Sequence, residues 1–289
     1  MALAKAINRQ AGAPAPEDRL SRADFQRLAR HIHAVAGIKM PDSKTVMLEG
    51  RLRRRVRATD TRSIAGYCNW LFEGDNLVAE ERHLINAVTT NKTDFFREPK
   101  HFDYLQATIL PQIAAAGKRR IRAWSAACST GAEPYTMAMV LDAFASDRGG
   151  PEYGILATDL DTEVLETARR GVFPAAMVDP VPAVLRSRYV LKSSLPGRDA
   201  VRMAPELRGA IGFAPLNLMD ATYPVGEPMD LIFCRNVLIY FEKEAQGRVV
   251  SRLLDRLKPG GHLFLGHSES IAGFDLPVTA VANTVFRKN

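Results

Sequence analysis

Two stretches of the chain carry residue types from which a nucleotide site could be built. Residues 121–136 (IRAWSAACSTGAEPYT) form an apolar run that breaks into small residues before a helix predicted to start near Glu133. Residues 155–161 (ILATDLD) form a second apolar run, which ends in the carboxylate of Asp159. A strand, a small-residue turn, a helix and a second strand ending in an acid are typical of a βαβ nucleotide-binding unit. The terminal carboxylate can accept hydrogen bonds from both ribose hydroxyls, each worth about 1.5–3 kcal/mol.

The small-residue turn does not carry the motifs that bind phosphates. A dinucleotide fingerprint would read G-x-G-x-x-G at this turn, but here Gly131 is the one glycine between Ala126 and Glu133. The chain also lacks the P-loop pattern G-x-x-x-x-G-K-[ST]. A ligand with a ribose and no phosphates, such as S-adenosylmethionine, therefore fits these residues better.

The rest of the chain predicts the elements that position this turn. Strands are expected at 121–127, 153–159 and 229–236, and helices at 133–145, 161–170 and 242–257. Short segments separated by Pro-Gly and Arg-Gly predict a small antiparallel β insert at about 186–214, and the C-terminal residues predict a final pair of strands. Together these patterns predict an open, Rossmann-like α/β sheet with helices on both faces and an antiparallel edge.

The first third of the chain has a different, helical pattern. Residues 1–18 are rich in Ala and Pro and predict a disordered tail, whereas residues 19–90 predict an all-helical domain. Its helices are expected to begin at Ser21, to be capped by Asp42 or Ser43, and to cover Ser63–Phe72 and Leu77–Val88. Residues 91–120 are predicted to be a linker and a connecting helix that resumes near His101, and residues 121–289 a nucleotide-binding domain.

The second predicted helix carries an unusual density of arginine. Leu48, Leu52 and Val56 form its apolar stripe, and five of the seven residues 51–57 are arginines with no acid among them. These are Arg51, Arg53, Arg54, Arg55 and Arg57. One interpretation is a solvated face whose arginines cover the apolar stripe with their stems. The other, which the density of charge favours, is a surface that docks an acidic partner.

Composition limits the class of protein. The net charge is +7, and residues 1–90 hold 15 Lys and Arg against 10 Asp and Glu, which directs the first segment toward an acidic partner. No apolar run approaches the ~20 residues that a membrane span needs. Cys68, Cys128 and Cys234 are too widely spaced for a disulfide framework or a C-x-x-C metal site. We therefore expect a cytoplasmic protein, with no metal and no membrane insertion.

Taken together, these motifs make the chain similar to the chemotaxis receptor methyltransferases (CheR), which transfer methyl groups from S-adenosylmethionine to glutamates of chemoreceptor helices. The resemblance covers nearly all of residues 89–270 in the family's order. The matching segments are NKTDFFRE (91–98), AWSAACSTGAEPYTMAM (123–139), ATDLDTEVLETARRGVF (157–173), PLNL (215–218), FCRNVLIYF (233–241) and LKPGGHLFLGHSES (257–270). The family also has a helical N-terminal domain.

The resemblance implies a set of site residues. The cofactor-binding residues would be Asn91, Thr93, Arg97, Glu133, Asp159, Asn217, Leu218, Arg235 and Asn236. Arg97 and Tyr240 would orient the glutamate carboxylate, which is already ionised near pH 7 and needs no general base. Where the family often has two acids before Pro-Tyr, this chain has Ala132 followed by Glu133.

The resemblance also implies partners. The arginine-rich helix would dock the cytoplasmic helical bundle of a chemoreceptor, and S-adenosylhomocysteine would be the second product. The insert resembles a β-subdomain that in some members binds the C-terminal tail peptide of the receptor, but its turn SSLPGRD (193–199) lacks their glycine-rich form, so tail binding stays open. A monomer that binds no nucleic acid is expected. Three alternatives remain: a methyltransferase for a related non-chemotaxis receptor, a nucleic-acid methyltransferase, and an adaptor that binds the cofactor without turnover.

Overall fold

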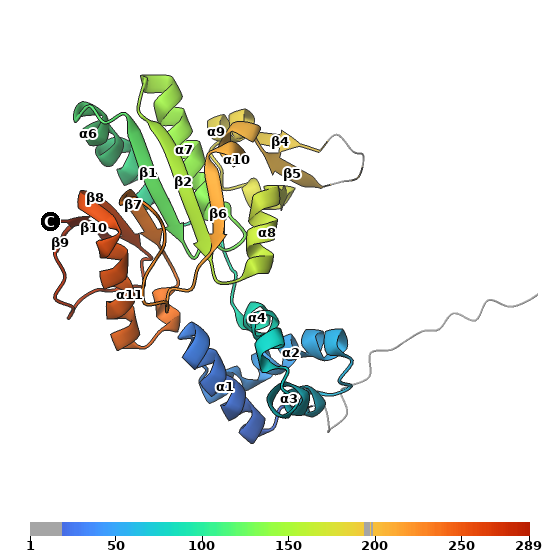
Figure 1. Cartoon of the computed structure of the whole chain (residues 1–289). Coiled ribbons are helices and arrows are strands. Elements are labelled where there is room, and N and C mark those ends of the chain that lie inside the picture. Colours follow the sequence, from blue (N-terminus) through green and yellow to red (C-terminus); the bar gives the residue numbers. More distant parts are fainter. Residues whose placement is uncertain (1–18, 194–196, 198) are drawn as a thin grey trace, which may run out of the picture. The chain divides into compact units, whose positions relative to one another are not determined.

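The computed structural model describes residues 19–193, 197 and 199–289 (Figure 1). The predicted tail, residues 1–18, lies outside this part of the chain. The described residues form two compact units, one made of residues 19–31 and 40–88 and the other of residues 32–39 and those from 89 to 289. No helix among the described residues is long and apolar enough to cross a lipid bilayer.

The first unit is all-helical. Its elements are α1 (Arg22–Ala36, with residues 32–36 counted in the second unit), η2 (Asp42–Lys44), α2 (Thr45–Thr59), α3 (Ile64–Glu73) and α4 (Leu77–Val88). Ser21 caps α1 as predicted, since its Oγ accepts from the Asp24 N–H at 3.0 Å and donates to the Asp24 carboxylate at 2.7 Å. The predicted caps Asp42 and Ser43 are wrong, because both lie in the 3-10 turn before α2 and no side chain caps that helix.

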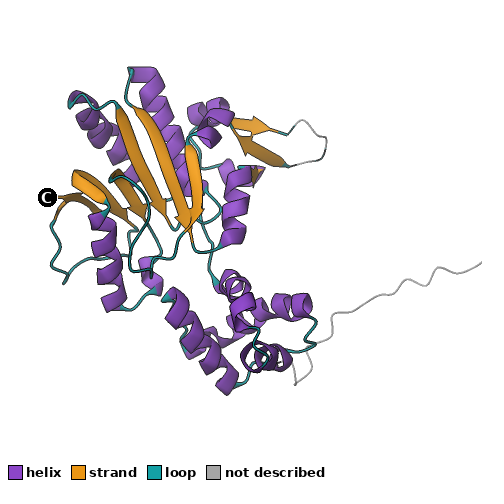
Figure 2. Ribbon diagram, viewed as in Figure 1, coloured by secondary structure: helices purple, strands orange, loops and turns teal. Residues whose placement is uncertain are grey.

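The second unit contains a seven-stranded sheet (Figure 2). Its strands run in the order β6 (Ile211–Pro215), β2 (Glu152–Asp159), β1 (Arg120–Ala126), β7 (Met229–Cys234), β8 (Leu257–Leu265), β10 (Val285–Lys288) and β9 (Val278–Ala282). The pairs from β6 to β8 are parallel, whereas β10 is antiparallel to both of its neighbours. The predicted open α/β sheet with an antiparallel edge is confirmed.

Helices cover the sheet because a parallel sheet must bury both faces. The helices of this unit between residues 100 and 255 include α5 (Lys100–Tyr104), η3 (Leu105–Ile109), α6 (Leu110–Ala115), α7 (Ala132–Arg148), α8 (Thr162–Arg170), α9 (Ala183–Tyr189), α10 (Pro205–Gly209), η5 (Leu238–Tyr240) and α11 (Lys243–Asp255). Successive residues of β7 enter different cores: Phe233 packs with the residues of α5 to α8, and Ile232 with those of α11. All six residues of β7 are buried, which explains its unbroken apolar sequence.

The connecting helix contains an irregularity with a sequence cause. Between α5 and α6, residues Leu105–Ile109 are π-helical, and Pro111 occupies the first turn of α6. A proline lacks the N–H of a regular helical turn, and its ring clashes with the carbonyl four residues earlier, so an inserted residue relieves the conflict. The predicted resumption of helix near His101 is confirmed by α5.

A second, three-stranded antiparallel sheet forms the insert. Its order is β3 (Val172–Pro174), β5 (Ala200–Met203) and β4 (Val190–Lys192), with η4 (Ala175–Val178) and α9 between β3 and β4. The predicted boundaries of 186–214 are therefore wrong at both ends. The insert begins with β3, and Ile211–Pro215 forms β6, which pairs in parallel with β2 in the main sheet. Residues 194–196 and 198 of the turn SSLPGRD (193–199), for which tail binding stays open, lie outside the described residues.

Candidate active site

The candidate site lies where the strand order reverses. In the sheet, β2 and β6 lie on one side of β1, and β7 lies on the other side. The loops that leave the carboxyl ends of the strands on the two sides therefore diverge and form a crevice. Non-glycine residues with left-handed backbone gather in these loops and in the linker: Ala127 (φ 64°), Ser129 (φ 51°), Asn236 (φ 59°), Phe96 (φ 52°) and Glu98 (φ 56°). Each such residue costs of order 1–3 kcal/mol and persists only where its surroundings hold it.

Asp159 ends β2 with its carboxylate held by backbone. The Ser129 N–H donates to Oδ2 at 2.8 Å and the Asp161 N–H donates to Oδ1 at 2.9 Å, and the residue is 8% exposed. Each oxygen therefore keeps acceptor capacity for a ligand hydroxyl. Burial raises the pKa of Asp159 to about 6, although the N–H groups of Asp161 and Ser129 oppose the shift.

Asn91 holds the loop after β1 beside the helix that follows β2. Its Nδ2 donates to the Asp161 carboxylate at 2.7 Å, and its carbonyl accepts from the Ser129 hydroxyl at 2.8 Å. Asp161 caps α8 by accepting from the N–H groups of Glu163 (2.9 Å) and Val164 (3.3 Å). The start of the linker is thus joined to the Asp159 end of β2.

Arg235, which follows β7, bridges two carboxylates. Its Nη2 lies 2.9 Å from Oε2 of Glu98, and its Nη1 lies 3.1 Å from Oε2 of Glu133. The same guanidinium donates to the carbonyl of Arg97. The Arg235 side chain is 2% exposed, so the linker, α7 and the end of β7 meet around one buried cation.

The pKa values of the two carboxylates that share Arg235 are shifted in opposite directions. Burial would raise the pKa of Glu98, but the hydrogen bonds from Arg235 and from the N–H of His267 more than offset this and hold that pKa at about 2. Burial raises the pKa of Glu133 in spite of Arg235 and of the Ser125 hydroxyl, which donates to its Oε1 at 2.7 Å. Glu98 is therefore ionised throughout the neutral range.

Glu269 positions the segment after β7. Its buried carboxylate accepts from four backbone N–H groups, those of Asn236 (2.9 Å), Val237 (2.8 Å), Leu238 (2.7 Å) and Gly266 (2.6 Å). Burial raises its pKa and these hydrogen bonds counteract the rise. Gly266 is required here, since a Cβ at this position would lie 2.5 Å from Nδ2 of Asn236. Glu269 thereby holds Asn236 in its left-handed conformation.

Other predicted site residues make separate contacts. Asn217 donates to the carbonyl of Val35 at 2.7 Å, and the adjacent Leu218 is buried in the α11-side core. Thr93 and Arg97 are half-buried, and Nη1 of Arg97 donates to the carbonyl of Lys92 at 3.1 Å. Tyr240, also half-buried, accepts from the Lys39 N–H through its carbonyl. The predicted roles of these residues stay predictions.

Sequence reasoning missed three residues that organise this site: Glu98, Asp161 and Glu269. Glu98 directly follows Arg97 in the quoted FFRE segment, and Asp161 was recognised only as the start of a helix. Glu269 stands in the HSES segment, but no pattern shows that its carboxylate returns to residues 236–238. For Glu269, the signal available in the sequence was an acidic residue within a loop of small polar residues.

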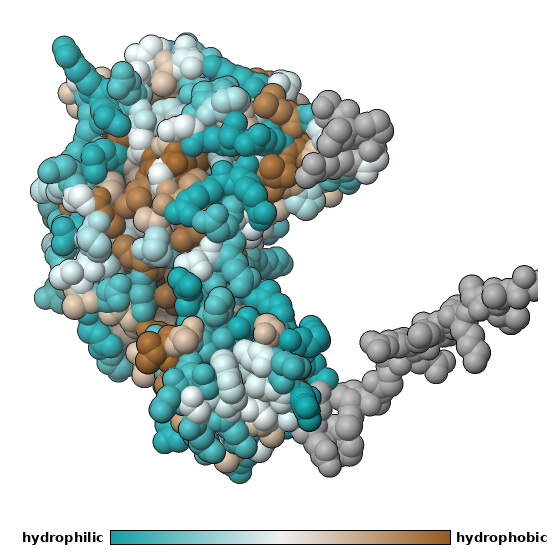
Figure 3. Space-filling view, turned by 45° about the vertical axis from the view of Figure 1, so that its right-hand side comes forward, coloured by the Kyte–Doolittle hydropathy of each residue, from teal (hydrophilic) through white to brown (hydrophobic). Residues whose placement is uncertain are grey.

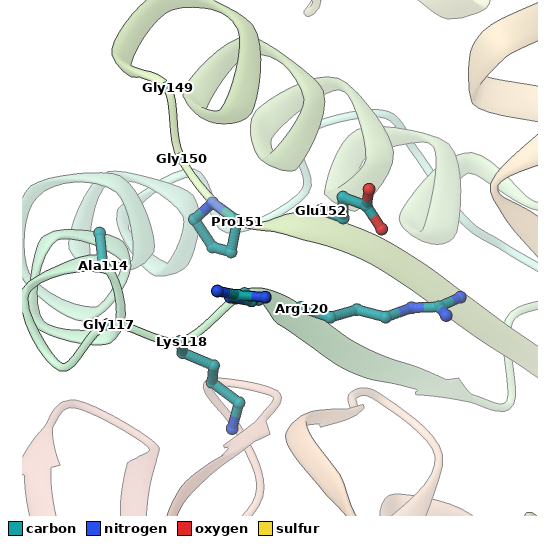
Figure 4. Close-up of a pocket in the computed structure, with 9 residues that line it drawn as sticks. Ala114, Gly117, Lys118, Arg120, Gly149, Gly150, Pro151 and Glu152 are labelled. Atoms are coloured by element: carbon teal, nitrogen blue, oxygen red, sulfur yellow. The ribbon is translucent and has the colours of Figure 1, made fainter.

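A hollow among the described residues of the second unit lies away from the Asp159 site. It measures about 460 Å³ and is lined by residues at the amino ends of β1 and β2, among them Lys118, Arg120 and Glu152 (Figure 4). Ligands of parallel α/β sheets bind at the carboxyl ends of the strands. The hollow is therefore at the wrong edge of the sheet to serve the Asp159 site.

The residues at the carboxyl ends fit a ribose-containing cation. Asp159 offers acceptors for ribose hydroxyls, and Glu133, whose side chain is 12% exposed, adds a second carboxylate from the first turn of α7. Nε of Arg235 is buried and has no hydrogen-bond partner among the described residues, as expected of a donor that faces a ligand.

Comparison with known proteins agrees with this geometry. Residues 91–286 match the family model described as CheR methyltransferase, SAM binding domain, and residues 23–89 match CheR methyltransferase, all-alpha domain. Chemotaxis protein methyltransferase 2 of Pseudomonas aeruginosa is 38% identical, covering 92% of this chain and 93% of its own. Chemotaxis protein methyltransferase of Escherichia coli is 39% identical, covering 92% and 91%.

Solved structures align more weakly. The glycopeptide N-methyltransferase MtfA complexed with S-adenosylmethionine aligns over 68% of this chain and 60% of its own, at 13% identity and a TM-score of 0.36. The assignment therefore depends on the sequence relatives and on the two family models. The chain is an S-adenosylmethionine-dependent methyltransferase, and it belongs to the CheR methyltransferase family.

Proposed function

We propose that this protein transfers the methyl group of S-adenosylmethionine to glutamate side chains on the cytoplasmic helices of a chemoreceptor, forming glutamate methyl esters. The observation that carries the proposal is the match of both CheR domains, over residues 23–89 and 91–286. The names of the relatives, chemotaxis protein methyltransferases, support the same substrate class. The site is compatible with it, since an ionised carboxylate needs no general base.

In this mechanism the chain contributes binding and alignment. S-adenosylmethionine supplies an electrophilic methyl group when it is bound. Asp159 would hold the ribose, and Arg97 and Tyr240 would orient the incoming carboxylate. Alignment of two reactants in this way can reach effective molarities of about 10⁵–10⁸ M. The Arg235 bridge supports it by holding the carbonyl of Arg97.

The direct test uses labelled S-adenosylmethionine with purified receptor cytoplasmic domains. We expect label in the receptor that mild alkali releases as methanol, because a carboxylate methyl ester is hydrolysed under these conditions. Mapping of the esters identifies the glutamates. Label in DNA or RNA supplied in parallel would favour a nucleic-acid methyltransferase, and cofactor binding without transfer to any substrate would favour an adaptor.

Replacement of Tyr240 by Phe should lower turnover more than it lowers cofactor affinity. The change removes one hydroxyl that we expect to contact the substrate carboxylate and leaves the Asp159 site intact, so the loss should be in kcat. Steady-state kinetics with receptor domain and calorimetry with cofactor measure the two effects. Equal turnover in both proteins would remove Tyr240 from the mechanism.

We propose a docking surface on α2 that contains three of the five arginines. Nε of Arg55 lies 2.6 Å from Oε1 of the buried Glu80, and the same oxygen accepts from the Tyr67 hydroxyl at 2.9 Å. Arg51 donates to the carbonyl of Val88. The guanidinium groups of Arg51 and Arg55 therefore bind acceptors within the first unit. Arg54 and Arg57 are exposed and Arg53 is half-exposed, so we propose these three as the docking set.

Replacement of Arg53, Arg54 and Arg57 by Ala should raise the Michaelis constant for receptor and flatten its salt dependence. Exposed charge pairs contribute roughly 0–1 kcal/mol each and act chiefly on the association rate, so three must be removed together. Cofactor affinity should not change. The matched control replaces the exposed Arg22, Arg30 and Arg82, with the same loss of charge. Equal effects of the two triple variants would show that only net charge matters.

The β-subdomain remains a candidate for receptor tail binding. Val184 of α9 (77% exposed) and Leu191 of β4 (47% exposed) are exposed apolar side chains of the insert. Figure 3 shows hydrophobic residues gathered beside the grey atoms of its turn. A peptide of the receptor C-terminus would find apolar contacts here, and fluorescence anisotropy with labelled tail peptide measures whether it binds.

A further inference from the structure

Three side chains that could bind a metal ion converge beside the Arg235 bridge. One ligand atom each from Glu98, His101 and His267 lies within 4.8 Å of the others. The two imidazoles meet edge to face, with their ring centroids 4.9 Å apart. His267 is also held through its main chain, because its N–H donates to Oε1 of Glu98 at 3.1 Å. All three residues belong to the second unit.

The hydrogen bonds of His101 leave one nitrogen without a partner. Its Nε2 lies 3.3 Å from the carbonyl of Asn283 and 3.0 Å from the hydroxyl of Thr284. A carbonyl can only accept, so Nε2 carries the proton and Nδ1 carries a lone pair.

The lone pair on Nδ1 of His101 faces the oxygen lone pairs of the Glu98 carboxylate. Nδ1 of His101 is buried, has no hydrogen-bond partner among the described residues, and lies 3.6 Å from Oε2 of Glu98. The side chain is 2% exposed, so bulk water does not solvate the atom. A buried acceptor opposite an ionised carboxylate is unfavourable unless a positive group lies between them. Arg235 supplies only part of that charge, because it is shared with Glu133.

We propose that Glu98, His101 and His267 form a binding site for a divalent d-block cation of the zinc class. Two imidazole nitrogens and a carboxylate oxygen are ligands that this class of ion prefers. Zinc–ligand distances are about 2.0–2.2 Å, so ligand atoms that now lie up to 4.8 Å apart must move closer to one another. The exposed ring of His267 can make that adjustment and leaves the site open to solvent.

The surroundings of His101 are those of a metal ligand. A metal-bound imidazole usually donates its other N–H to a protein oxygen, which fixes the ring and its tautomer. Here the N–H of Nε2 has the Thr284 and Asn283 oxygens, and the ring packs edge-on against Phe264 at 5.7 Å. Because His267 lies 166 positions after His101 in the chain, no spacing motif in the sequence indicates the site. The inference does not depend on the substrate proposed above.

The test uses Co²⁺ as a visible probe on the full chain after treatment with a chelator. We expect one equivalent of Co²⁺ to produce the d–d absorption of a low-symmetry site, Zn²⁺ to abolish that absorption by displacement, and the melting temperature to rise. His267→Ala removes one of the three ligands and should weaken binding by at least about tenfold, since loss of even an outer-shell partner costs about 10- to 100-fold. Its side chain is exposed, so the variant should fold normally.

Two further proteins make the result decisive. His101→Phe keeps a ring against Phe264 but removes both nitrogens, and it should also lose the absorption band. His33→Ala removes an exposed histidine of α1 and should retain the band. No absorption change in the unaltered chain, or an unchanged band in folded His267→Ala, would overturn the proposal.

Discussion

Replacement of Arg235 by Met should reduce the free energy of unfolding of the second unit by about 3–5 kcal/mol, the cost of removing one partner from a buried ion pair. The change leaves the carboxylates of Glu98 and Glu133 without their shared cation, at 2.9 and 3.1 Å in the present structure. Urea unfolding measures the effect. The chain has two tryptophans, and a Trp70→Phe background leaves Trp124, fully buried in β1, to report on this unit alone.

The loss should depend on pH in a defined direction. The pKa of Glu98 is held at about 2, below its ordinary value, so its stabilising effect is present above about pH 4.5 and is lost as the pH falls toward 2. The difference between the two proteins should therefore shrink in acid. Arg186→Met, which breaks an exposed pair with Asp179, is the control and should cost at most about 1 kcal/mol. A similar small cost for Arg235→Met would show that the bridge contributes little.

Replacement of Asp159 by Ala should weaken S-adenosylmethionine binding at least about tenfold, which corresponds to about 1.4 kcal/mol. The variant removes the carboxylate that ends β2, where we place the ribose hydroxyls, and each hydrogen bond to a charged group is worth about 1.5–3 kcal/mol. Calorimetry measures the affinity, and circular dichroism shows whether the variant is folded. Unchanged affinity in a folded variant would contradict the ribose assignment.

The same residue predicts how affinity varies with pH. Burial raises the pKa of Asp159 to about 6, so the carboxylate gains a proton as the pH falls through that value and loses acceptor capacity. Affinity in the unaltered protein should therefore fall by up to about tenfold per pH unit below 6. The raised pKa of Glu133 adds its own pH dependence, which Asp159→Ala retains. An identical pH profile in both proteins would assign the effect to Glu133.

The sequence predicted most of the main fold correctly because its signals are local. The apolar runs of β1, β2 and β7 and the periodic pattern of α4 follow from side chains that face a core within a few residues. The insert was misplaced because Ile211–Pro215 is short and follows a turn, as an insert strand would. Only its parallel pairing with β2 makes it an edge of the main sheet, and pairing partners are not written in a strand's own sequence.

For the candidate site, the difference between what the sequence predicts and what only the tertiary structure shows is larger. Sequence by itself predicted Asp159 as a site residue, because an acid that ends a strand of a βαβ unit is recognisable from two adjacent elements, and the family resemblance predicted Glu133 and Arg235. It could not show that Arg235 joins Glu98, 137 positions away in the chain, to Glu133, 102 positions away, or that Glu269 returns to residues 236–238. These contacts exist because the carboxyl ends of parallel strands meet at one edge, where charges from distant segments neutralise one another away from water. Only the tertiary structure decides which charges those are.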